Sequence, residues 1–86
     1  MKYFAALLTM HDPAKSQDLR PQHIEFLDRM GSEGKIFARG RFADGAGGLV
    51  VYQADSLEAA RKIAEDDPYV KSGARTLEIH EWEMKK

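Results

Sequence analysis

Residues 2–10 are apolar on both of the faces that an extended chain presents. The alternating sets are Tyr3, Ala5 and Leu7 on one face, and Phe4, Ala6, Leu8 and Met10 on the other. Such a segment predicts a strand that is covered on both sides of its sheet. The alternative reading is a signal peptide, but the apolar run is short and continues into His11-Asp12-Pro13 without a small-residue cleavage site.

Length and charge limit the classes of protein that this chain can belong to. Its 86 residues favour one domain, over residues 1–86, with a thin core. The lack of cysteine excludes disulfides, thiolate metal sites and cysteine nucleophiles. Interspersed charges with a net value of −1 disfavour nucleic acid as a partner. The apolar runs are far shorter than the roughly 20 residues of a membrane span, so we expect a cytoplasmic protein with no membrane partner.

The first half of the chain predicts a loop, a helix and a strand after residue 10. Residues 11–17 have no period and are predicted to be a loop. Pro21 fits the first turn of a helix that runs to about Glu33, because the missing N–H costs nothing there. The predicted buried face of this helix consists of Ile24, Phe26, Leu27 and Met30. The side chains of residues 35–42 then alternate between two faces, which predicts a strand.

The second half begins with a glycine-rich turn. Residues 43–48 connect the strand at 35–42 to one at 49–54, which predicts a β-hairpin. Asp55 and Glu58 are spaced as the N-cap and N3 residues of a second helix, and Pro68 is expected to stop it. The apolar positions of that helix are Leu57, Ala60, Ile63 and Ala64. Residues 67–72 allow a short turn, and residues 75–83 form the last strand.

The resulting order, β-α-β-β-α-β, predicts an α+β fold of the ferredoxin-like type. This fold has a four-stranded antiparallel sheet with both helices on one face. Because the first strand is apolar on both faces, the second face of the sheet also needs a cover. We expect a homodimer in which two sheets pack face to face; the alternative is an unfilled ligand groove.

The topology gathers several polar residues at one rim of the sheet. The first strand ends there, the first helix begins there, and the second helix ends there. His23, in the first turn of the first helix, should therefore approach Asp66 and Asp67. A His–Asp pair suits general acid–base chemistry, because the carboxylate fixes one tautomer of the imidazole. The structural alternative is a surface histidine beside an ordinary helix end.

Other patterns at this rim admit both structural and functional interpretations. Gly45-Ala46-Gly47-Gly48 is better explained as a hairpin turn than as a phosphate cradle, because a strand follows it and not a helix. Arg39 and Arg41 either bind an acidic group of a substrate or keep an edge strand soluble. The three histidines lack the spacing of metal ligands, so no metal site is expected.

The residues Arg20-Pro21-Gln22-His23, Gly40, Asp55-Ser56-Leu57-Glu58 and Asp67-Pro68-Tyr69, in this order and spacing, resemble the YciI-like family, or YCII-related domain. The resemblance covers nearly the whole chain. It implies the dimeric α/β-barrel arrangement, in which two ferredoxin-like sheets face each other, and an active site centred on a histidine and an aspartate. These fall on His23 and Asp67, with Arg20 and Tyr69 at neighbouring motif positions.

Three hypotheses follow for the function. The leading one is a small enzyme without a cofactor, in which His23 exchanges a proton with a small, cyclic or aromatic organic substrate. Asp67 would orient the imidazole, and Arg20 or Arg41 would steady the developing negative charge. The family resemblance implies elimination-type chemistry. The second hypothesis is a non-catalytic dimeric module that binds a small metabolite in the same pocket, and the third is a cofactor-free oxygenase.

Overall fold

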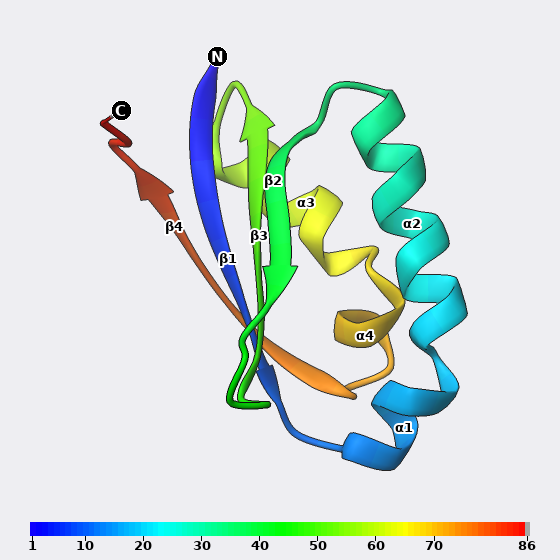
Figure 1. Cartoon of the computed structure of the whole chain (residues 1–86). Helices are drawn as coiled ribbons and strands as arrows, with labels where there is room; N and C mark the ends of the chain where they lie inside the picture. The colour runs from blue at the N-terminus through cyan, green and yellow to red at the C-terminus, as the bar shows by residue number, and fades with distance from the viewer. Residues whose placement is uncertain (86) are drawn as a thin grey trace.

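Strand β1 lies in the middle of a four-stranded sheet whose order is β2-β3-β1-β4, and every neighbouring pair is antiparallel. The structure, a computed structural model, describes residues 1–85. Its elements are β1 (Lys2–Met10), α1 (Pro13–Asp18), α2 (Arg20–Ser32), β2 (Ile36–Arg41), β3 (Gly47–Ala54), α3 (Leu57–Glu65), α4 (Pro68–Lys71) and β4 (Arg75–Trp82). All the helices lie on one side of the sheet (Figure 1). The predicted ferredoxin-like α+β fold is confirmed.

The core lies between the helices and the sheet. Phe4, Ala6 and Leu8 of β1 are directly opposite Tyr52, Val50 and Gly48 of β3, so their side chains project from the same face. The other buried residues of the core are Phe26, Leu27, Met30, Ala54, Ala60, Ala64 and Ile79. Two fully buried alanines of α3, at the spacing of one helical turn, let this helix approach the sheet closely.

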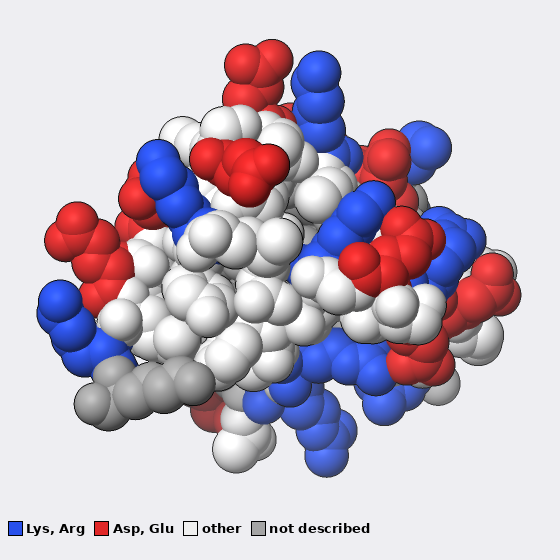
Figure 2. Space-filling view, turned by 90° about the horizontal axis from the view of Figure 1, so that it is seen from above, with Lys and Arg blue, Asp and Glu red and all other residues white. Residues whose placement is uncertain are grey.

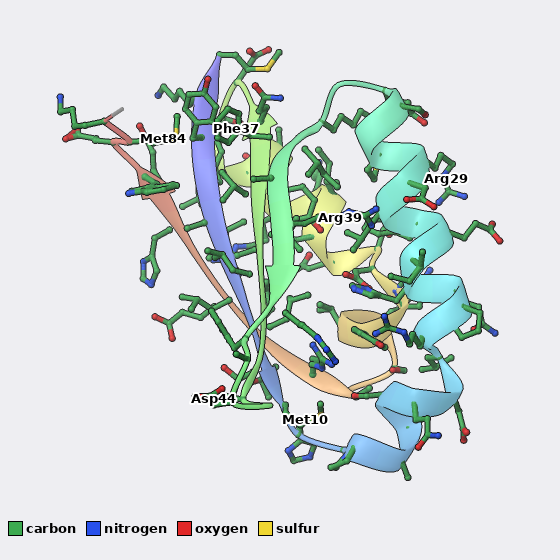
Figure 3. All side chains as sticks on the ribbon, in the orientation of Figure 1. Met10, Arg29, Phe37, Arg39, Asp44 and Met84 are labelled. Atoms are coloured by element: carbon green, nitrogen blue, oxygen red, sulfur yellow. The ribbon has the colours of Figure 1, made fainter. Side chains whose placement is uncertain are left out.

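The opposite face of the sheet has no helix over it. The register places Ala5 and Leu7 of β1 beside Val51 and Leu49 of β3 on this face. Two aromatic groups add to the patch: Tyr3 meets Phe37 edge to face with ring centroids 5.1 Å apart, and Trp82 pairs with Tyr3 in the register. Figure 3 shows Phe37 on the side of β2 away from α2, whereas Arg39 extends toward that helix. Along β4, Glu78 and His80 make this face polar.

Two local predictions are wrong. Residues 13–18 form helix α1 and not a loop, because the Asp12 side chain caps the helix by accepting a hydrogen bond from the Lys15 N–H (3.0 Å) and Pro13 occupies the first turn. The N-cap of α3 is Ser56 and not Asp55, since the Ser56 hydroxyl accepts from the Ala59 N–H (3.1 Å). Pro68 lies beyond the end of α3, as expected, and begins α4.

One end of the sheet collects segments from the whole chain, as the topology predicted. The end of β1, the start of α2, the β2–β3 hairpin, helix α4 and the start of β4 all lie in the lower part of Figure 1. Figure 3 shows Asp44 at the tip of the hairpin on the same side as Met10. The opposite end, seen in Figure 2, carries acidic and basic side chains around an uncharged centre.

Within residues 1–85, no helix has the length and apolar character needed to cross a bilayer. The longest, α2, has 13 residues and an exposed polar side. Its inward side carries Phe26, Leu27 and Met30, which are buried. It is therefore an amphipathic helix that packs on the sheet.

The close pairing of β1 and β3 makes Gly47 sensitive to substitution. A Cβ atom on Gly47 would lie 1.9 Å from the Leu8 carbonyl oxygen, and the residue has φ +138°. We expect Gly47→Ala to lower the free energy of unfolding by about 3 kcal/mol or more, because backbone strain and a steric clash add together. Urea unfolding followed by circular dichroism measures this change.

Gly45→Ala is the matched control. Gly45 also has a positive φ (+82°), but a Cβ there would meet open space, so only a strain of about 1–2 kcal/mol is expected. Equal losses in the two variants would contradict the close approach of β1 and β3 at Gly47.

Candidate functional site

His23 and Asp67 form a buried hydrogen-bonded pair although 44 positions separate them in the sequence. The distance from His23 Nδ1 to Asp67 Oδ1 is 2.8 Å. The exposed fraction of His23 is 8% and that of Asp67 is 0%. Helix α2 positions the histidine in its first turn, on the side that faces α4. The pair that the topology predicted is present in the structure, whereas Asp66 is exposed and caps the C-terminal end of α3.

Asp67 is held in place by the start of α4. Its Oδ1 accepts a hydrogen bond from the Tyr69 N–H (2.9 Å), so the residue is the N-cap of this helix. A carboxylate at a helix N-terminus is favourable. Asp67 is therefore placed favourably at the start of α4. Its second oxygen, Oδ2, is buried and has no hydrogen-bond partner among the described residues.

The pairing determines which nitrogen of His23 carries the proton. The ionised carboxylate only accepts hydrogen bonds, so Nδ1 must be the donor, and this assignment follows from the hydrogen-bond network. In the neutral ring, Nε2 then has the free lone pair. Because His23 lines a cavity, this lone pair can take a proton from a bound molecule.

Tyr69 stacks on the histidine, and Arg75 in turn lies over Tyr69. The ring of Tyr69 lies parallel to that of His23, with an interplanar angle of 15° and ring centroids 3.8 Å apart. The guanidinium carbon of Arg75 lies 4.4 Å from the centroid of the Tyr69 ring. The Arg75 Nε–H also donates to the Ser16 hydroxyl (3.4 Å). The imidazole is therefore fixed by a carboxylate at its edge and by an aromatic ring on its face.

A cavity of about 270 Å³ opens beside His23, between α2 and strands β2 and β3. Its walls combine apolar side chains with arginines. The apolar side chains are Leu8, Ile24, Leu27 and Val50, and the arginines are Arg20, Arg39, Arg41 and Arg75. A small molecule with both an apolar part and a polar or charged part fits such a cavity.

The five residues predicted to carry catalysis or substrate binding lie at this place. His23, Arg20, Tyr69 and Arg41 line the cavity, and Asp67 lies behind His23. The other two histidines are elsewhere: His11 follows β1 and is exposed, and His80 pairs with Glu78 (2.6 Å) on the open face of the sheet. Within residues 1–85, no three His, Asp or Glu side chains gather in a way that would hold a metal ion.

Arg75 and Tyr52 were not predicted from the sequence. The signal for Arg75 was available, because the start of the last strand was already expected at the same rim. No feature of the sequence pointed to Tyr52, because its position is that of an apolar residue in an internal strand. Its side chain is fully buried, and burial together with the negative charge of Asp67 raises the pKa of the Tyr52 phenol far above its ordinary value.

The chain is similar to known proteins over nearly its whole length. A family profile described as the YCII-related domain matches residues 1–83. The uncharacterized protein YjpA of Bacillus subtilis (strain 168) is 43% identical over 84 residues, which cover 98% of this chain and 99% of YjpA.

Among solved structures, the chain is similar to the 5-chloro-2-hydroxyhydroquinone dehydrochlorinase TftG of Burkholderia phenoliruptrix AC1100, in complex with 2,5-dihydroxybenzoquinone. The TM-score is 0.79, and the match covers 96% of this chain and 95% of the other at 18% identity. At this identity the likeness shows a shared fold.

The buried phenol of Tyr52 predicts a loss of stability at alkaline pH. In the unfolded chain the phenol loses its proton near pH 10, whereas the folded protein retains it. The unfolded state then binds fewer protons, so the free energy of unfolding should fall by about 1.4 kcal/mol per pH unit above pH 10. Urea unfolding between pH 7 and pH 11 measures the slope.

Tyr52→Phe should remove this part of the slope. The control is Tyr3→Phe, a half-buried tyrosine on the open face, which should leave the alkaline slope nearly unchanged. Identical slopes for the native protein and Tyr52→Phe would show that the folded state does not hold this proton.

Proposed function

This chain belongs to the YCII-related domain family, and from that membership and the geometry of its cavity we propose a small enzyme without a cofactor that performs acid–base chemistry. The observation that carries the proposal is the hydrogen bond between buried His23 and Asp67 on the wall of a cavity. A surface histidine would need neither a buried carboxylate nor a stacked aromatic ring. A histidine that is hydrogen-bonded to a carboxylate beside a cavity is a candidate for general acid–base catalysis.

In the proposed reaction His23 Nε2 takes a proton from a carbon of the substrate. The electron pair of the broken C–H bond forms a new π bond, and in an elimination the leaving group departs with its own bonding pair. In an isomerisation the imidazolium returns the proton at another atom. Asp67 stabilises the imidazolium, and Arg20 and Arg41 stabilise the negative charge that develops on the substrate.

The substrate is proposed to be a small organic molecule, and a cyclic or aromatic one suits the apolar wall and the ring of Tyr69. The dehydrochlorinase named above has the same fold, which supports elimination-type chemistry as a proposal for this chain. The proton exchange takes place between imidazole and substrate, so it calls for no cofactor. We also propose that the protein acts in the cytoplasm, which its lack of cysteine supports.

A homodimer through the open sheet faces is a second part of the proposal. Ala5, Leu7, Leu49 and Val51 form a continuous apolar area at the centre of this face. A groove of about 300 Å³ runs along it between β2 and β3, where a side chain of a second copy could insert. Trp82, with 43% of its surface exposed, lies beside this area and would be covered by the partner.

The acid–base proposal predicts the effect of His23→Ala. A panel of small cyclic acids, phenols and ketones is incubated with the protein in deuterated water, and exchange or loss of substrate protons is followed by NMR. For any compound that reacts, we expect His23→Ala to slow turnover by about 100-fold or more and to leave binding in place. Asp67→Asn should also slow it, because the amide no longer dictates the tautomer.

Arg61→Gln, on the exposed side of α3, is the control for a charge change outside the site. If compounds bind without reacting, and His23→Ala only weakens their binding, the chain is a binding module. Oxygen uptake during turnover would indicate an oxygenase.

The dimer is tested by sedimentation equilibrium over a range of concentrations. The native protein should sediment as a dimer, and Ala5→Glu and Trp82→Glu should shift it toward the monomer, because each places a charge in the apolar interface. Leu57→Glu is the matched control, since Leu57 is equally exposed (41%) but lies in α3, on the helical side of the sheet. A native monomer at every concentration, or equal effects of all three substitutions, would refute this interface.

A further inference from the structure

The cavity beside His23 carries an excess of positive charge. Four arginines line it, and no aspartate or glutamate does. Arg39 is neutralised from outside the cavity, because its Nη2 lies 2.6 Å from Oδ1 of Asp28 on α2. Within residues 1–85, Arg20, Arg41 and Arg75 form no ion pair with a carboxylate. The net charge of the chain is only −1, so this concentration of cations is local to the cavity.

Two of these arginines flank Gly48, Arg41 with its backbone and Arg75 with its guanidinium, and both line the cavity. The register places Arg41 of β2 directly opposite Gly48 of β3. From the other side, Nη1 of Arg75 lies 3.7 Å from the position that a Cβ on Gly48 would occupy. Because Gly48 has no side chain, none occupies the part of the cavity between these two arginines. Arg75 is also held in place before any ligand binds, because its guanidinium stacks on Tyr69 and its Nε–H donates a hydrogen bond to the Ser16 hydroxyl.

We infer that the cavity recognises a small organic carboxylate, whose carboxylate group binds between Arg41 and Arg75 above Gly48. A guanidinium presents parallel N–H donors that match the two oxygens of a carboxylate. The apolar wall formed by Leu8, Leu27 and Val50 receives the rest of the molecule. Bound in this way, the ligand extends from the arginines toward His23, which lines the same cavity.

This carboxylate site assigns a substrate class to the proposed function. It rests on that function only for the expectation that the reacting carbon lies near His23. The negative charge of the carboxylate is present before the reaction. The arginines therefore select the substrate, and the charge that develops after proton removal lies close to the same cations. The volume of about 270 Å³ limits the ligand to about the size of one ring with its substituents.

Benzoate is the probe for this site, and benzamide is its neutral analogue of nearly the same shape. Both are titrated into the protein at low salt, with calorimetry for affinity and the backbone amide resonance of Gly48 for location. We expect benzoate to bind at least about tenfold more tightly than benzamide and to shift the Gly48 resonance. Arg41→Gln and Arg75→Gln should each weaken benzoate by about tenfold or more.

Two other variants complete the test of the site. Arg75→Lys retains the charge in case Arg75→Gln unfolds, and should still bind benzoate less tightly because the planar fork is lost. Arg61→Gln, which removes an exposed arginine of α3, should change the affinity by no more than about twofold.

Several outcomes would overturn the inference. Equal binding of benzoate and benzamide, or no effect of either cavity substitution, would show that the arginines do not recognise the carboxylate. Inorganic phosphate binding as tightly as benzoate would show that the apolar wall contributes nothing and that the site accepts any anion.

His23→Ala separates this inference from the proposed function. The variant should still bind benzoate, because the carboxylate contacts the arginines. Turnover that survives this substitution would refute the acid–base proposal and leave the carboxylate site in place. Loss of benzoate selectivity, with turnover still dependent on His23, would refute only the carboxylate site.

Discussion

The fully buried carboxylate of Asp67 connects the two parts of the fold that make the site. A buried charge is tolerated only when polar partners compensate for the water it has lost. Asp67 finds two such partners, the imidazole of His23 on α2 and the Tyr69 N–H at the start of α4. One hydrogen bond therefore positions the catalytic base of the proposed enzyme, and the other positions the aromatic ring that stacks on it.

The two faces of the sheet serve different purposes. The helical face combines the core with the cavity, because the strand ends near the β2–β3 hairpin carry Gly48 and arginines, whereas the middle of β1 and of β3 carries apolar side chains. The open face is apolar over β1 and β3 and polar along β4. A strand in the centre of a sheet, apolar on both faces, is the common cause, since it requires cover on both sides.

Much of the fold and of the site could be predicted from the sequence. Strong periodicity located the four strands and the two long helices, and the topology then brought His23 to Asp67. The errors came from short-range hydrogen bonds: Asp12 and Ser56 both cap helices through side-chain oxygens, and several neighbouring residues could have done so. Asp67 was expected near the end of the second helix, whereas it is the N-cap of the next helix, α4.

The sequence by itself determined the family, the order of the elements and the rim at which the polar residues meet, because these depend on the spacing of apolar residues and on chain connectivity. Only the tertiary structure decided which groups touch. The stack of Arg75 on Tyr69, the charge of Asp67 acting on buried Tyr52 and the approach of the Arg75 guanidinium to Gly48 join residues on different elements. Their distances depend on strand register and helix packing, which no local pattern of residues specifies.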